Sequence, residues 1–196
     1  PQVEMDPIVR AALVHYQFET AHPFLDGNGR LGRLLITLML INDGVLHSCL
    51  FYPSFQFKKN RSEYYRQLTS VRERGTYEEW IEFFCNSLLE SAKDSVGSLK
   101  NLVDLHNRST ATITENLGRT AANGQRLLGI LEEHPIVDTA FIAAQLDIGR
   151  STASSLVKSF EELGILRPLD ESRQRYRQYG YEEYLSILRE DAEPIR

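Results

Sequence analysis

The chain has 196 residues, 42% of them hydrophobic, and a formal net charge of −5 at pH 7. This length suits one large or two small domains with a sizeable core, and the acidic balance argues against blanket binding to nucleic acid. No apolar run is long enough to span a membrane, and the polar start lacks a signal-peptide pattern. Because Cys49 and Cys85 are isolated in sequence, we expect free thiols and a cytoplasmic protein without a membrane partner.

The first predicted element is a helix over residues 6–20. Asp6 is a favourable N-cap, and Pro7 is tolerated at the first helical position. Apolar residues follow at helical spacing, so the helix leads directly to His22. We expect His15, inside this helix, to be a core or hydrogen-bonding residue rather than a catalytic one.

The next stretch, residues 22–33, reads HPFLDGNGRLGR and has the features of an anion site. Gly27 and Gly29 bracket Asn28 and allow backbone turns that other residues resist. An apolar, helix-forming run over residues 31–40 follows directly. Free N–H groups of the turn and the positive end of the helix dipole therefore point at one place, and phosphate is the usual anion bound there.

The charged side chains of the same stretch suit a nucleotide. Arg30 and Arg33 lie three residues apart near the helix start, and a guanidinium can grip phosphate through two bonds. Asp26 offers a hard oxygen ligand for a Mg²⁺ that also touches phosphate oxygens. His22 can accept a proton at neutral pH. The combination favours a Mg²⁺–nucleotide site over a plain turn with two surface arginines.

This stretch resembles the signature of Fic domains, H-x-F-x-D/E-G-N-G-R-x-x-R, and matches it at every defined position. HYQFE at residues 15–19 and WIEFF at residues 80–84 are also typical of Fic proteins. The resemblance implies a mainly α fold with a Fic-type helical core over residues 1–95. No hairpin signal occurs in residues 1–10, so we expect the substrate-aligning flap of Fic proteins, and their inhibitory glutamate, to lie upstream of the chain in a longer protein.

The resemblance implies a protein adenylyltransferase (AMPylator). Such an enzyme transfers AMP from ATP to a Tyr, Ser or Thr hydroxyl of a target protein or of itself and releases pyrophosphate, so ATP and Mg²⁺ are the expected cofactors. The site residues that the signature implies are the catalytic base His22, the metal ligand Asp26, and the nucleotide-binding Gly27, Asn28, Gly29, Arg30 and Arg33.

Two alternatives remain open. The same site could remove AMP from a target, which the motif does not exclude. The chain could instead be a DNA-binding regulator whose Fic-derived domain is a sensor. Phosphorylation of targets is disfavoured, because Fic relatives with that activity often carry Ala in place of Gly27 and Lys in place of Gly29.

Further helices are predicted after the motif. Residues 31–43 are apolar nearly all round, which predicts a helix buried in the middle of a domain. Residues 60–74 read as an amphipathic helix, and Thr76 with Glu79 starts another in capping-box form. Residues 96–122 are more polar and are expected to form a helical connector.

Three tyrosines follow the motif at a distance, namely Tyr52, Tyr64 and Tyr65. The corresponding region of Fic proteins helps to hold the adenosine. We nevertheless expect these phenols to pack in the core, because that is the commoner role of aromatic residues at helical spacing.

The pattern changes over residues 123–196, where a second domain is predicted. Helices are expected at residues 125–133, from Asp138 or Thr139 onward, and from Ser151 or Thr152 onward. The last two are joined by a short glycine-containing turn, which is the helix-turn-helix pattern. Strands at residues 165–169 and 175–179 would form a wing, and a helix over residues 181–191 closes the chain. The unit resembles the small winged helix-turn-helix domains often found at the C-terminus of Fic proteins.

The second domain has two possible roles. Recognition helices use their N-terminal residues in the major groove. The possible DNA contacts are Arg150, Ser151, Thr152, Ser154 and Lys158 in that helix, and Arg173 and Arg175 in the wing. Neighbouring acidic residues leave a weakly basic face, which predicts weak, salt-sensitive binding. A protein-interaction module or a homodimer contact is the equally supported alternative.

Overall fold

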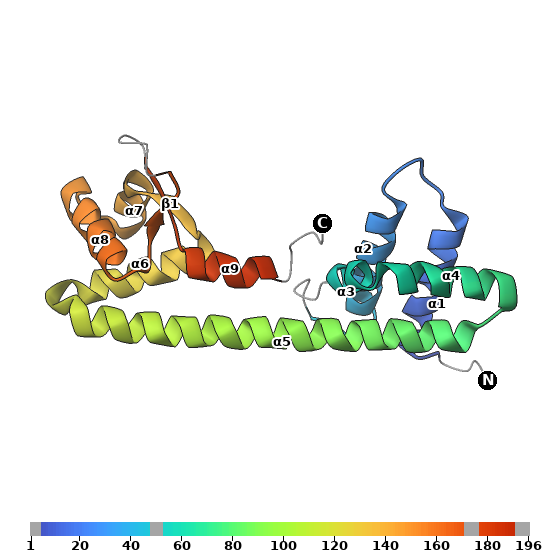
Figure 1. Ribbon diagram of the computed structural model, residues 1–196. Coiled ribbons are helices and arrows are strands. Elements are labelled where there is room, and N and C mark those ends of the chain that lie inside the picture. Colours follow the sequence, from blue (N-terminus) through green and yellow to red (C-terminus); the bar gives the residue numbers. More distant parts are fainter. Residues whose placement is uncertain (1–4, 48–52, 171–176, 191–196) are drawn as a thin grey trace. The chain divides into compact units, whose positions relative to one another are not determined.

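The computed structural model describes residues 5–47, 53–170 and 177–190. The chain divides into two compact units, one ending at Gly97 and one extending over Ser98–Glu190. Both units are mainly helical, as predicted (Figure 1). Within the described ranges, no helix is long and apolar enough to cross a membrane.

The first unit is built from helices. They are α1 (Pro7–Ala21), α2 (Asn28–Asn42), α3 (Ser54–Lys59), α4 (Arg61–Arg74) and the first part of α5 (Tyr77–Asn116). α1 begins as predicted, because Asp6 Oδ1 accepts a hydrogen bond of 2.8 Å from the Ile8 N–H and Pro7 is the first helical residue. A turn of six residues then separates α1 from α2, and it holds the first half of the motif, from His22 to Gly27.

The core of the first unit is aromatic. Trp80 and Phe84 of α5 are fully buried, and Phe57 of α3 and Tyr64 of α4 pack against them. Trp80 Nε1 donates a hydrogen bond of 3.0 Å to the Ala12 carbonyl, which ties α5 to α1. Trp80 and Phe84 therefore anchor the N-terminal part of α5 in this core.

α2 differs from its prediction in two ways. It begins at Asn28 because Gly27, with a φ of 83°, serves as its N-cap in the left-handed region. It is also not buried all round: Leu34 is 51% exposed, and Leu31 and Leu38 are exposed to a similar extent. The prediction of full burial is wrong because α1 packs on one face of α2, and no described element covers the leucines on the other.

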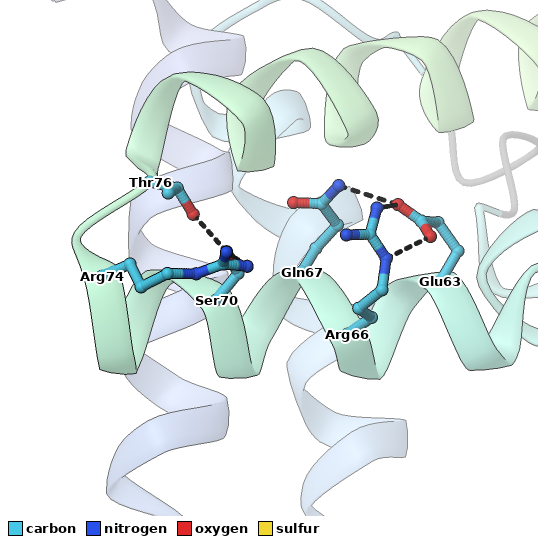
Figure 2. Close-up of polar contacts among 6 residues, drawn as sticks. All are labelled: Glu63, Arg66, Gln67, Ser70, Arg74 and Thr76. Carbon is cyan, nitrogen blue, oxygen red and sulfur yellow. Dashed lines mark hydrogen bonds and ion pairs between the residues drawn. The ribbon is translucent and has the colours of Figure 1, made fainter.

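Polar contacts hold the turn between α4 and α5 (Figure 2). Ser70 Oγ lies 2.7 Å from the Thr76 hydroxyl and accepts a 2.9 Å hydrogen bond from Arg74 Nη2. Nearer the start of α4, Glu63 accepts hydrogen bonds from Arg66 and Gln67. Thr76 thus directly precedes α5, and its hydroxyl ties that helix start back to the end of α4.

The second unit combines helices with a small sheet. Its elements are the second part of α5, the 3-10 turn η1 (Gly118–Thr120), α6 (Ala121–Glu133), β1 (Ile136–Asp138), α7 (Thr139–Leu146), α8 (Arg150–Glu162), β2 (Arg167–Pro168), β3 (Gln178–Gly180) and α9 (Glu182–Glu190). The predicted connector over residues 96–122 consists of α5, η1 and the first residues of α6. Phe160 and Tyr181 lie in the core of this unit.

The sheet corrects the prediction for the second unit. It has three antiparallel strands in the order β1-β3-β2, with Ile136 and Arg167 both opposite Gly180. β1 was missed because its last residue, Asp138, reads as a helix cap; it is also that cap, accepting 2.8 Å from the Phe141 N–H. The two predicted strands are shorter than expected, and residues 171–176 lie outside the described ranges.

Candidate functional site

A pocket of about 620 Å³ opens beside the N-terminus of α2. One wall is the glycine-rich motif, and the other comes from α3 and α4. The lining residues are His22, Leu25, Asp26, Gly27, Asn28, Gly29, Arg30 and Arg33 on the first wall, and Phe57, Lys58, Arg61, Tyr64 and Tyr65 on the second. The structure therefore brings every site residue predicted in the motif to one cavity.

Asn28 fixes the turn from within. Its Oδ1 accepts 2.9 Å from the Phe24 N–H, and its Nδ2 donates 2.6 Å to the Phe24 carbonyl. The residue is 2% exposed, so both bonds are shielded from water. The Asn28 side chain thus shapes the turn, and what this residue offers the pocket is its backbone.

The N-terminus of α2 has no side-chain cap. Gly27 is the N-cap residue and lacks a side chain that could accept from the first-turn N–H groups. In the described part of the chain, the Gly27 N–H donates to Asp26 Oδ1 at 2.6 Å. The first backbone hydrogen bond of the helix runs from the Leu31 N–H to the Gly27 carbonyl. Unsatisfied N–H groups at a helix start favour an anion.

The two arginines of the motif are held differently. Arg30 Nη2 is 3.8 Å from Asp26 Oδ2, and both side chains are largely exposed, so this ion pair contributes little. Arg33 donates from Nε to Ser54 Oγ at 3.2 Å. A methyl group added at Gly29 would lie 3.1 Å from Arg33 Nη1, so the guanidinium of Arg33 lies close to that glycine.

His22 lies where α1 ends. It is the C-cap residue, with φ 46° and ψ 55°, and its N–H donates 3.0 Å to the Phe18 carbonyl. A left-handed conformation is uncommon for a residue with a side chain, and such positions concentrate at functional sites. The exposed imidazole lines the pocket.

His15 lies buried beneath the motif, as predicted. Its Nδ1 is 3.0 Å from the Gly32 carbonyl and its Nε2 is 2.9 Å from the Tyr64 hydroxyl. A carbonyl can only accept, so Nδ1 carries the proton and Nε2 accepts from Tyr64. Burial lowers the pKa of His15 to about 4, which keeps the ring neutral.

Glu19 is a half-buried acid that sequence reasoning missed. Its Oε1 is shielded from water and has no hydrogen-bond partner among the described residues. Burial raises the pKa of this carboxyl, while the charges of Arg33 and His22 lower it by smaller amounts. Glu19 belongs to the HYQFE segment, which is typical of Fic proteins, but nothing in the sequence around it indicates that its carboxyl oxygen is shielded from water.

The second wall also adds residues that the sequence did not single out. Lys58 and Arg61 bring two further positive charges to the pocket, and the Arg61 guanidinium lies 5.6 Å from the centre of the Tyr65 ring. Tyr64 is buried as predicted, but Tyr65 is half-exposed and lines the pocket, so its expected core role is wrong. Adjacent helical residues point in different directions, and this signal could have separated the two tyrosines. Tyr52 lies outside the described residues.

A self-contained metal centre does not occur in the described ranges, because no three His, Cys, Asp or Glu side chains gather there. Asp26 supplies a single carboxylate to the pocket. One carboxylate suits Mg²⁺, which is usually bound by one or two carboxylates together with substrate phosphates.

The predicted DNA contacts of the second unit lie on α8. Arg150, Ser151, Thr152, Ser154 and Lys158 are all exposed. Lys158 Nζ lies 3.7 Å from Glu162, an exposed pair. The two wing arginines of the prediction, Arg173 and Arg175, lie outside the described residues.

Comparison with known proteins agrees with the motif. The profile of the Fic/DOC family matches residues 2–40. Protein adenylyltransferase fic-1 of Caenorhabditis briggsae is 35% identical over 96 residues, which is 49% of this chain and 18% of that protein. The fic-1 protein of Caenorhabditis elegans is 34% identical over 100 residues, covering 51% and 18%, and the protein adenylyltransferase Fic of Drosophila ananassae is 37% identical over 82 residues, covering 42% and 15%.

A solved structure is also similar. A Fic family protein from Desulfovibrio desulfuricans G20 aligns with 91% of this chain and 50% of its own, at 22% identity and a TM-score of 0.47. The aligned part of this chain spans less than a fifth of the length of the curated relatives named above. The family profile and these relatives support the Fic domain family for the N-terminal part of the chain.

Proposed function

We propose that the first unit carries the active site of a protein adenylyltransferase, which transfers AMP from ATP to a Tyr, Ser or Thr hydroxyl of a target protein or of the chain itself. The observation that carries this proposal is the pocket itself. It combines an uncapped helix N-terminus, the imidazole of His22 and four cationic side chains. This set suits a substrate with several phosphates and a reaction that needs one proton acceptor.

In the proposed reaction, His22 takes the proton from the target hydroxyl. The hydroxyl oxygen attacks the α-phosphorus in line, and the bond to the bridging oxygen breaks so that pyrophosphate leaves. The N–H groups at the start of α2 bind phosphate oxygens, and Arg30 and Arg33 offset the negative charge of the β- and γ-phosphates. Asp26 would hold Mg²⁺, which when bound supplies additional positive charge to the phosphates.

The test uses the purified chain with ATP labelled either at the α- or at the γ-phosphate, in the presence of Mg²⁺. We expect label on protein from α-labelled ATP alone, and its loss in His22→Ala. His47→Ala is the matched control, because His47 is an exposed histidine of the same unit that does not line the pocket. Label from γ-labelled ATP would instead assign phosphorylation, and labelling that survives in His22→Ala would refute the base assignment. If the chain strips AMP from a pre-labelled target without pyrophosphate, removal of AMP is the better description.

A second candidate function concerns the second unit, which we propose is a winged helix that binds DNA. The arrangement supports this proposal, because three helices, α6 to α8, precede a hairpin of β2 and β3. Four of the exposed polar residues of the prediction lie at the N-terminal end of α8, and Lys158 follows further along it. We expect weak binding to duplex DNA that declines steeply with salt and weakens further in Arg150→Ala. A concentration-dependent dimer with no DNA binding would assign this unit to protein contact.

A further inference from the structure

Arg33 is fixed more firmly than Arg30, the other arginine of the motif. Arginine has a long side chain that loses rotamer entropy when it is held in one conformation. Here the Nε–H group donates to Ser54 Oγ at 3.2 Å, and the guanidinium lies close to Gly29. Arg30, in contrast, is 79% exposed in its side chain and meets Asp26 at a long 3.8 Å. The guanidinium of Arg33 is thus oriented by its contacts, whereas that of Arg30 is largely surrounded by solvent.

Ser54 is itself well placed to act as an anchor. It is 4% exposed and is the first residue of α3, the short helix that also brings Lys58 to the pocket. α3 is held at two further points. Phe57 is buried in the aromatic core, and Gln56 Nε2 donates 2.6 Å to Asp94 Oδ2 of α5. The hydroxyl that Arg33 meets therefore belongs to a segment with little freedom to move.

The single hydrogen bond from Nε has a directional consequence. A guanidinium has five N–H donors in a rigid plane, so fixing Nε leaves four donors on the two Nη atoms with a set orientation. These donors lie next to Gly29 in the first turn of α2, because a methyl group there would come within 3.9 Å of Cζ and of both Nη atoms. Any anion bound at the start of α2 would meet those Nη donors.

We propose that Ser54 is a positioning residue that orients the guanidinium of Arg33 for the terminal phosphates of the nucleotide. This inference rests on the proposed function, since it assigns the anion to ATP. The residue lies 21 positions after Arg33 and outside the glycine-rich motif, and it acts through Arg33 rather than on the substrate. It prepares the site before binding, so that less side-chain freedom is lost when ATP enters.

Binding of ATP and of AMP separates this role from a general loss of structure. Ser54→Ala should weaken ATP binding about tenfold, the usual cost of one hydrogen bond that holds a charged group, and leave AMP binding within about twofold. The matched control is Ser87→Ala, which also removes a buried serine hydroxyl with one hydrogen bond, to the Phe83 carbonyl, away from the pocket. Ser87→Ala should leave both affinities unchanged.

A second measurement needs no nucleotide. In nitrogen-edited NMR spectra, the Nε–Hε signal of Arg33, assigned by its loss in Arg33→Lys, should exchange slowly with water in the original chain and in Ser87→Ala. In Ser54→Ala it should exchange as fast as the signals of exposed arginines. This measurement tests the Ser54 contact even where ATP binding fails.

Several results would overturn the proposal. They are an unchanged ATP affinity in Ser54→Ala, an equal weakening of ATP and AMP, or an Arg33 signal that Ser54→Ala leaves unaltered. If Arg33→Ala also leaves ATP affinity unchanged, the phosphate role of Arg33 is wrong, and this counts against the proposed function as well. A silent Ser54→Ala beside a damaging Arg33→Ala counts against Ser54 alone.

Discussion

His15 should make the stability of the first unit depend on pH. In the folded chain it is neutral, because it donates to Gly32, accepts from Tyr64 and is removed from water. The pKa of His15 falls from 6.5 to about 4, so between these values the unfolded chain binds a proton that the folded chain does not. Stability from this group is therefore full above pH 6.5 and is lost as the pH falls toward 4.

The size of this effect is on the order of 3 kcal/mol, at about 1.36 kcal/mol per pKa unit. Urea unfolding followed between pH 4 and 7 should show the decline. His15→Gln keeps one donor and one acceptor without a titrating ring, and it should remove most of the slope. An equal slope in both proteins would show that His15 is not the group responsible.

Glu19 should act in the opposite direction. Its folded pKa is raised by burial, so its contribution to stability is present at low pH and is lost as the pH rises through the folded pKa. At neutral pH, an ionised Glu19 keeps a buried oxygen without a partner. Glu19→Gln should therefore raise the melting temperature at pH 7 and flatten the pH dependence in the acid range. A melting temperature that falls at pH 7 would mean that the carboxylate has a stabilising partner.

At the scale of elements, the contact between α1 and α2 depends on the absence of a side chain at Gly32. A methyl group there would lie 2.5 Å from Glu19 Oε1 and 3.1 Å from both His15 Cε1 and Phe18 Cδ1. The Glu19 carboxylate can move, but the two rings are packed. Gly32→Ala should therefore destabilise the first unit by about 1–3 kcal/mol, the usual cost of overpacking.

Gly97→Ala is the matched control for this prediction. Gly97 also lies inside a helix, but an added methyl group would meet nothing within 4 Å. Alanine is the better helix former, so this variant should be stabilised by up to about 1 kcal/mol. Chemical denaturation of both variants makes the comparison, and two shifts of the same sign would contradict the close packing at Gly32.

Helices and turns could be predicted from sequence where residues at their own ends determine them, and not where a neighbouring element does. The start of α1 is coded by Asp6 and Pro7, and the turn at the motif by Gly27 and Gly29, so both were found from sequence. β1 was missed because three residues next to a cap carry no alternation to detect. The exposure of Leu34 was missed because an apolar helix face does not reveal whether a neighbour covers it.

The same limit applied to the site. The motif wall is contiguous in sequence, and the predicted motif residues all line it together with Leu25, which was not predicted. Ser54, Lys58 and Arg61, in contrast, enter through the packing of α3 and α4. Glu19 lies in the HYQFE segment, but its partial burial follows from the close packing of α1 on α2. Long-range contacts of this kind have no local signature.

At the scale of the whole molecule, two separate cores predict two separable unfolding events. Phe84 lies fully buried in the core of the first unit and Phe160 fully buried in that of the second. Phe84→Ala and Phe160→Ala should each cost about 3–5 kcal/mol, but in different units. Calorimetry should show Phe84→Ala lowering one transition and Phe160→Ala the other. A single transition that both variants lower equally would mean that the units unfold as one.

The two hydrogen bonds of Asn28 also bear on chemical ageing. Asn28 is followed by Gly29, and an asparagine before glycine is the sequence most prone to lose its amide through attack by the next backbone nitrogen. That attack needs a mobile side chain, while here both ends of the amide are bonded to the backbone of Phe24 and shielded from water. The rate of deamidation at Asn28 should therefore report how often the turn opens. Each event would leave a new carboxylate next to the proposed phosphate site and permanently reduce its attraction for anions.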